Sequence, residues 1–113
     1  MAEEKKLIPL TVLRRKIAET VTASKQNIPH FYVQVDIDMS KAAELLNRWS
    51  AEKGAKPTMT HLILKAAAQA LTEVPGLNVS YTPEGIVCHP AVHMGFAMAL
   101  DGGMIIPVIR NAD

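Results

Sequence analysis

The chain has 113 residues, with 12 Lys and Arg against 11 Asp and Glu, so its formal net charge is +1 with neutral His. This balance excludes the basic surplus of nucleic-acid-binding modules and the acidic, weakly hydrophobic composition of disordered tails. Hydrophobic residues make up 49% of the sequence, which is enough for a chain of this size to form one ordered domain.

The only cysteine is Cys88, which excludes an intramolecular disulfide and a metal site built on several cysteines. The N-terminal residues fit neither a secretory signal nor a transit peptide, and no apolar run approaches the roughly 20 residues of a membrane span. We therefore expect a soluble protein of the reducing cytoplasm that binds no nucleic acid and no membrane. Aromatic residues make up only 4% of the sequence, and aliphatic residues are abundant. Such a surplus of aliphatic surface favours burial between the subunits of an oligomer.

Residues 1–7 show no periodicity and are predicted to be a flexible leader ahead of a domain over residues 8–113. Behind Thr11, a suitable N-cap, apolar residues recur every four positions from Leu13 to Val21, which predicts an amphipathic helix that ends near Asn27.

Residues 31–39 follow Pro29 and alternate between apolar and polar side chains, which predicts a strand with one buried face. A second helix is predicted from Ser40, which would cap it, to a stop at Gly54.

A third helix is predicted from Thr58 or Thr60 to Val74, and its nearly continuous apolar character predicts that it is mostly buried. Residues 77–81 and 86–89 read as the two strands of a hairpin around a Thr-Pro-Glu-Gly turn.

Residues 92–100 alternate large and small side chains, and small residues on one strand face allow another backbone or an elongated ligand to approach. An Asp-Gly-Gly turn then leads into a last extended run over residues 104–109. The mixture of helices and turn-linked strands predicts an α+β fold with a largely antiparallel or mixed sheet.

The histidines are the natural candidates for acid–base or metal chemistry. His89 and His93 are four residues apart, but Pro90 and the strand pattern exclude the helix that would bring them onto one face, so we predict no metal site. For His61, in the first turn of a helix, a capping or surface role is favoured, and for His30 packing is favoured over chemistry. Cys88 has no identifiable activating base and is predicted to be structural.

Seven stretches of the sequence, in order and at similar spacing, resemble the N-terminal half of the catalytic domain of dihydrolipoamide acyltransferases, the core components of 2-oxo acid dehydrogenase complexes. The stretches are Ile8–Thr11, Leu13–Ala18, Ser24–Gln26, Pro29–Phe31, Leu64–Ala67, Pro75–Asn78 and Gly103–Asp113.

The resemblance implies a chloramphenicol-acetyltransferase-like fold, a mixed sheet flanked by helices, of which this sequence covers about half. It implies trimer-based oligomers and transfer of an acyl group between coenzyme A, a substrate, and a dihydrolipoyl group carried on a separate lipoyl domain. In that chemistry a histidine deprotonates the attacking thiol, and a hydroxyl donor stabilises the tetrahedral intermediate.

The family's catalytic motif, His-x-x-x-Asp-Gly, does not occur in the sequence. The one Asp-Gly pair, Asp101-Gly102, has Ala97 where the histidine would stand. We therefore expect no catalytic residue here, and acyl transfer only after a partner chain with the C-terminal half of the domain supplies the motif. The alternatives are a truncated protein and a non-catalytic scaffold or acyl-thioester-binding module derived from the same fold.

Three residues match family positions that the resemblance assigns to the coenzyme A site or its channel: Arg14, Ser24 and His30. Arg14 is expected to pair with the motif aspartate or with a ligand phosphate, and Ser24 and His30 are expected at the channel mouth. Roles in helix surface and turn packing stay open for all three.

Overall fold

The structure is a computed structural model that describes residues 5–113, so residues 1–4 of the predicted leader lie outside the described residues. Residues 5–7 are exposed and belong to no helix or strand. The chain divides into two compact units. Unit 1 runs up to Val35 and includes Ala99–Gly103, and unit 2 comprises Asp36–Met98 and Met104–Asp113.

The first predicted helix is confirmed as α1, Val12–Asn27. It begins where predicted because the Thr11 side chain accepts a hydrogen bond from the backbone N–H of Arg14 at 3.3 Å. It ends at Ile28, which turns to extended backbone while its N–H still donates to the Ser24 carbonyl.

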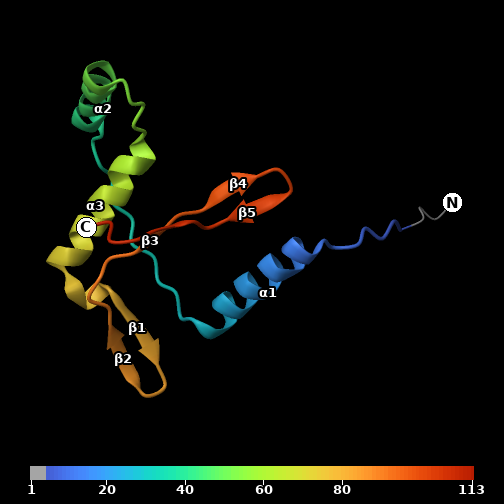
Figure 1. Cartoon of the computed structure of the whole chain (residues 1–113). Helices are drawn as coiled ribbons and strands as arrows, with labels where there is room; N and C mark the ends of the chain where they lie inside the picture. Colours follow the sequence, from blue (N-terminus) through green and yellow to red (C-terminus); the bar gives the residue numbers. More distant parts are fainter. Residues whose placement is uncertain (1–4) are drawn as a thin grey trace. The chain divides into compact units, whose positions relative to one another are not determined.

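The strand predicted for residues 31–39 is wrong. This connecting segment (residues 31–39), which joins α1 to α2, belongs to no strand, and residues 31–38 are all exposed (Figure 1). The alternation of side chains is present in the sequence, but a strand also needs a neighbour that supplies backbone hydrogen bonds. The described part of the chain supplies none to residues 31–38.

The second predicted helix is confirmed as α2, Ser40–Lys53, with Gly54 in the left-handed conformation at its C-terminus (φ 63°). The predicted capping by Ser40 is wrong in detail. The Asp38 carboxylate accepts hydrogen bonds from both the N–H and the hydroxyl of Ser40, at 2.9 and 2.6 Å. Asp38 therefore stabilises the start of this helix.

The third predicted helix is confirmed as α3, Met59–Glu73, which follows Thr58 at the N-cap. The prediction that α3 is mostly buried is wrong, because only Ala68 is buried. Its apolar faces are only partly covered within the described residues. A short 3-10 helix, η1 (Pro75–Leu77), follows α3.

The predicted hairpin is confirmed: β1 (Val79–Thr82) pairs antiparallel with β2 (Gly85–Cys88) in a register that places Val79 opposite Cys88. Pro83 and Glu84 form the turn.

The alternating run 92–100 forms two short strands, β3 (Met94–Gly95) and β4 (Met98–Leu100), instead of one. β4 pairs with β5 (Gly103–Ile105), and β3 pairs antiparallel with β6 (Val108–Ile109). The fold is α+β as predicted, but the described residues contain three separate two-stranded sheets.

Gly95 of β3 pairs with Val108 of β6, and a neighbouring side chain lies close to it there. A Cβ atom at Gly95 would stand 3.3 Å from Cγ2 of Ile106, closer than most such contacts in proteins. In unit 1, a Cβ atom at Gly103 would collide with the Leu13 side chain, so the β4–β5 turn and α1 lie against each other at this glycine.

The core of the described structure is small. Only Ala68 and Val92, both in unit 2, are buried hydrophobic residues. The whole chain exposes 10326 Å² of accessible surface, whereas two separate compact bodies of the units' sizes would together expose about 7,300 Å². The chain therefore exposes about 3,000 Å² more surface than two such bodies.

Hydrogen bonds hold the C-terminal residues within unit 2. The Ala112 N–H donates to the Val92 carbonyl at 2.9 Å, and Lys65 Nζ on α3 donates to the Ala112 carbonyl at 3.2 Å. Within residues 5–113, no helix is long and apolar enough to cross a membrane.

Candidate functional site

Helix α1 carries two of the three predicted site residues, Arg14 and Ser24, and His30 follows three residues after its end. Arg14 and His30 are exposed and Ser24 is half-buried. Ten residues separate Arg14 from Ser24, which corresponds to roughly 15 Å along the helix axis. The structure therefore spreads these side chains along α1 and beyond its end and does not bring them together around one atom.

The ring of His30 is fixed by a hydrogen bond from Nδ1 to the carbonyl of Ile28 at 2.7 Å. A carbonyl can only accept, so Nδ1 carries the proton and Nε2 of the neutral ring has a free lone pair. Within residues 5–113, no hydrogen bond engages that Nε2. His30 is therefore the histidine of unit 1 that can accept a proton or a ligand hydrogen bond.

Lys25 and Tyr32 form a further polar pair in unit 1, which the sequence analysis missed. Lys25 Nζ donates to the Tyr32 hydroxyl at 2.7 Å and lies 5.5 Å from the centre of its ring. Seven residues separate the two, across the end of α1 and Pro29. A sequence signal existed, because Tyr32 is the one aromatic residue on the polar side of the alternating segment.

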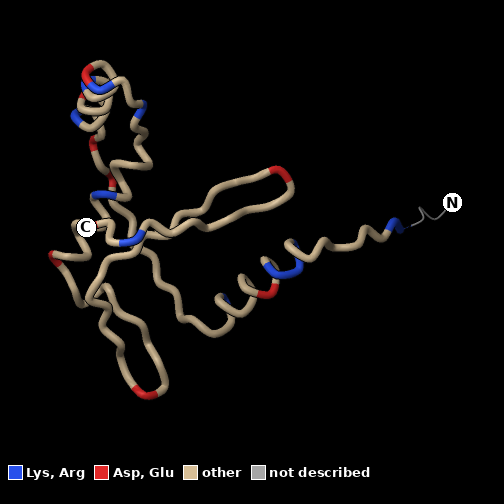
Figure 2. The backbone as a smooth tube through the Cα atoms, in the orientation of Figure 1, with Lys and Arg blue, Asp and Glu red and all other residues tan. Residues whose placement is uncertain are grey.

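The charges on α1 are mostly positive, as Figure 2 shows by the Lys and Arg positions along this helix. Lys16 lies 3.9 Å from the carboxylate of Glu19, the one ion pair within the described residues. Arg14 has no carboxylate partner there. Its guanidinium group is thus available to an anionic group, either a carboxylate or a phosphate.

In unit 2, a cavity of about 360 Å³ is lined by Asn78, His89, Pro90, Ala91 and His93. His89 Nε2 lies 2.7 Å from the Ser80 hydroxyl, and the N–H of Asn111 donates to His93 Nδ1 at 3.1 Å. Each ring is therefore held through one of its nitrogens by a neighbouring residue of the same unit.

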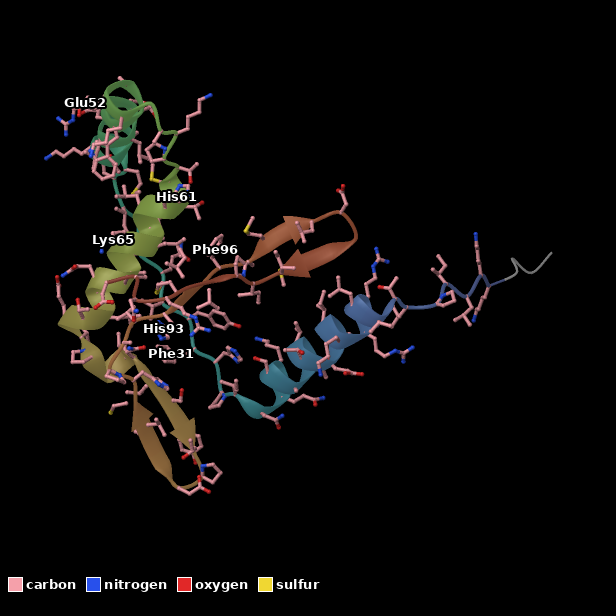
Figure 3. All side chains as sticks on the ribbon, viewed as in Figure 1. Phe31, Glu52, His61, Lys65, His93 and Phe96 are labelled. Atoms are coloured by element: carbon pink, nitrogen blue, oxygen red, sulfur yellow. The ribbon has the colours of Figure 1, made fainter. Side chains whose placement is uncertain are left out.

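A smaller cavity of unit 2, about 200 Å³, is lined by His61, Leu64, Lys65, Ile109 and Ala112. Figure 3 labels His61 and Lys65, which lie on α3. His61 Nδ1 accepts a hydrogen bond from the backbone N–H of Thr58 at 2.9 Å, so the capping role favoured for His61 is confirmed.

Within residues 5–113, no group of three or more His, Cys, Asp or Glu side chains could hold a metal ion. Cys88 is free and exposed on β2. The described side chains thus offer cations, histidines that each keep one ring nitrogen without a hydrogen bond, and two small cavities, but no complete set of acid, base and nucleophile.

Comparisons with known proteins agree on one family. The family model for 2-oxoacid dehydrogenases acyltransferase (catalytic domain) matches residues 2–113. A curated relative, the dihydrolipoyllysine-residue acetyltransferase component of the pyruvate dehydrogenase complex of Rhizobium meliloti (strain 1021), is 39% identical over 95% of this chain and 26% of its own length.

Solved structures show the same fold. A structure of the Azotobacter vinelandii dihydrolipoamide acetyltransferase, determined in a study of a serine, a histidine and an asparagine in its catalytic mechanism, matches with a TM-score of 0.90 and 33% identity. The cubic core of the pyruvate dehydrogenase multienzyme complex matches with the same TM-score and identity. Both matches cover 97% of this chain and 47% of the solved chain.

The chain thus spans about a quarter of the length of the curated relative and about half of the solved chains. The resemblance found in the sequence is confirmed, and so is its extent. The chain belongs to the 2-oxoacid dehydrogenase acyltransferase family, of whose catalytic domain it is a part.

Proposed function

We propose that this chain forms part of a dihydrolipoamide acyltransferase and takes part in acyl transfer between a dihydrolipoyl group and coenzyme A when a partner chain supplies His-x-x-x-Asp-Gly. The observation that carries the proposal is the family match over residues 2–113 of a sequence in which this motif does not occur. The partner is the C-terminal half of the same kind of catalytic domain.

The chemistry divides between the two chains. The partner's histidine removes the proton from the attacking thiol, the thiolate attacks the thioester carbonyl, and the second thiol leaves with the returned proton. This chain supplies walls of the channel in which both substrates lie. Arg14 pairs either with the motif aspartate, which fixes the partner's loop, or with a phosphate of coenzyme A.

The geometry of unit 1 supports a wall role better than a catalytic one. Arg14, Ser24 and His30 are spread over a distance greater than the roughly 15 Å between the first two. Groups spaced in this way contact an elongated ligand such as coenzyme A at several points. His30 Nε2, which has a free lone pair, accepts a hydrogen bond from the ligand at the channel mouth.

The assembly follows from the exposed surface. An excess of about 3,000 Å² is far more than the roughly 800 Å² per partner that a standard interface buries. We extend the proposal to a trimer-based oligomer that receives the lipoyl group from a separate lipoyl domain, in agreement with the cubic core to which the chain is similar. The cytoplasm suits its free, exposed Cys88.

The test is reconstitution. This chain is mixed with the C-terminal half of the Azotobacter vinelandii catalytic domain, produced as a second chain, and acetyl transfer from acetyl-coenzyme A to dihydrolipoamide is measured. We expect activity only with both chains present. Arg14→Ala should lower turnover at least about 100-fold without loss of the complex, a loss typical of removing a charged group that orients a site. The matched control Arg48→Ala, an exposed arginine on α2, should leave turnover unchanged.

A stable complex without acyl transfer would contradict the proposal and favour the non-catalytic scaffold. Unchanged turnover in Arg14→Ala would remove Arg14 from the channel and leave the division of labour between the two chains in place.

A further inference from the structure

The hairpin β1–β2 brings a serine and a histidine together. Ser80 stands opposite Val87 in the register of the hairpin. His89 continues this register, because its N–H donates to the carbonyl of Asn78 at 3.0 Å. Two residues beyond Val87, it lies on the same face as Ser80 and is its diagonal neighbour, within reach of a long side chain. Its Nε2 atom lies 2.7 Å from the Ser80 hydroxyl oxygen, a distance at which a base can take the proton of a nucleophile.

The hairpin holds His89 in place through its backbone and leaves its ring to Ser80. Its N–H and its carbonyl are both bonded to Asn78, at 3.0 and 3.1 Å. Within residues 5–113, only Nε2 of the ring makes a hydrogen bond. With the ring proton on Nδ1, Nε2 accepts the hydrogen bond of the Ser80 hydroxyl and can act as its base. Both side chains are exposed, so a ligand can reach them.

A cavity adjoins this serine–histidine pair. The cavity of about 360 Å³ in unit 2 is lined by the ring of His89, and its volume suits a small ligand. Pro90 and Ala91 give it an apolar wall. His93, labelled in Figure 3, lines it as well. Because His93 Nδ1 accepts a hydrogen bond from the N–H of Asn111, the neutral ring carries its proton on Nε2. The cavity therefore offers apolar surface to an acyl chain and one N–H donor to a carbonyl oxygen.

The pair contains a nucleophile and a base but no separate acid, which limits the leaving group it can displace. An amine or an alkoxide must be protonated as it leaves, and that requires an acid in the site. A thiolate leaves without an acid, because an ordinary thiol has a pKa of about 8.5. The chemistry of the pair therefore selects an acyl thioester as the acyl donor.

We propose that Ser80 accepts an acyl group from an acyl thioester, with His89 as the general base. The Ser80 oxygen attacks the thioester carbonyl, and its proton moves to His89 Nε2. A carbon–oxygen bond forms, the carbon–sulfur bond breaks, and the thiolate leaves. The imidazolium then returns its proton to the solvent. The products are an acyl ester on Ser80 and a free thiol. This self-acylation takes place within unit 2 and needs no partner chain, so it goes beyond the proposed function.

Incubation of the full chain with acetyl-coenzyme A alone tests the proposal. Peptide mass spectrometry locates the acetyl group. Hydroxylamine at neutral pH identifies the bond, since it cleaves an ester and spares the amide of an acetylated lysine. We expect a hydroxylamine-sensitive acetyl group on Ser80.

Substitutions in the pair test the role of each residue. His89→Ala should slow acetylation of Ser80 at least about 100-fold, the lower end of what a positioned base contributes. This variant keeps the backbone bonds to Asn78 and should keep the circular dichroism of the parent chain. Ser80→Ala should abolish the ester, and Ser80→Cys should restore acylation as a thioester. Ser50→Ala, the same change on α2, is the control and should leave the rate unchanged.

Two results would overturn the proposal. One is acetylation confined to lysines or to the exposed Cys88, with none on Ser80. The other is an equal rate of Ser80 acetylation in the parent chain and in His89→Ala, which would leave His89 without a role as base. Neither result bears on the proposed function, because this assay contains no partner chain and the reconstitution measures transfer to dihydrolipoamide.

Discussion

The hairpin β1–β2 and the connecting segment have similar sequence patterns and different structures. Strand β1 and the connecting segment both alternate apolar and polar side chains, yet only β1 is paired as a strand. For β1, the neighbouring strand begins three residues after it ends. For residues 31–38, no neighbour lies in the described chain. Alternation therefore identifies which side chains would be buried in a strand. Whether a strand forms depends on a neighbouring segment that supplies backbone hydrogen bonds.

Burial follows the same division. Val92, near the base of the hairpin, is only 3% exposed, and Asn78 joins the hairpin to the turn after it through two hydrogen bonds from its side chain. The connecting segment has anchors near its ends and none along its apolar side. The chain by itself thus stabilises the hairpin but not the connecting segment.

The largest contrast is expected between the same substitution in the two regions. Val92→Asp buries a charge without a partner and should lower the free energy of unfolding of unit 2 by about 3–5 kcal/mol. Val35→Asp, in unit 1, should change the free energy of unfolding by less than about 0.5 kcal/mol, because Val35 is exposed. Urea unfolding followed by circular dichroism measures both, and equal effects would contradict the comparison.

Removal of the Asn78 side chain tests how the hairpin is held. Its Nδ2 donates to the carbonyls of His89 and Ala91, each at 3.1 Å. Asn78→Ala should lower the free energy of unfolding by about 2 kcal/mol, since two carbonyls lose a donor. Asn47→Ala on α2 is the control and should not lower the free energy of unfolding. If both variants unfold at the same urea concentration, these bonds do not hold the hairpin.

The hairpin turn depends on a glycine conformation that the connecting segment does not need. Gly85 has a φ of +145°, and a Cβ atom there would meet nothing within 4 Å. Gly85→Ala should therefore destabilise unit 2 by about 1 kcal/mol or more through backbone strain alone. Gly76→Ala, where φ is not positive and space is also open, should be neutral. Thermal unfolding of the two variants gives the comparison, and an unaffected Gly85→Ala would show that the turn tolerates a side chain.

The smallest effect is expected at the end of the connecting segment. Hydrogen bonds from the hydroxyl and N–H of Ser40 lower the pKa of the Asp38 carboxyl below its ordinary value of 3.8. The carboxylate therefore stabilises the start of α2 above pH 3.8, and this contribution is lost as the pH falls through the lower pKa of the folded state. An NMR titration of Asp38 checks the shift. Asp38→Asn should remove this pH dependence, and titration at or above 3.8 would contradict the bond.

Much of the fold could be predicted because its signals are local. Thr11 and Thr58 mark helix starts, Gly54 marks a helix end, and the Thr-Pro-Glu-Gly turn marks the hairpin. Each of these features is decided by hydrogen bonds or backbone angles within a few residues. The family was also predicted from motifs, and the comparisons confirmed it.

The failures share another cause. The two wrong predictions were the burial of α3 and the strand over residues 31–39. Both depend on elements that are distant along the chain or outside it, whereas periodicity indicates only which side chains would be buried. The Lys25–Tyr32 pair was missed because it depends on the direction the chain takes after α1.

The candidate site divides in the same way. The sequence by itself determined which helices form, which residues resemble family positions, and that His-x-x-x-Asp-Gly does not occur. Only the tertiary structure decided that His30 keeps Nε2 free and that an alternating segment stays unpaired. The reason is physical: caps and turns are satisfied locally, whereas burial, strand pairing and the convergence of side chains require distant groups to meet in space.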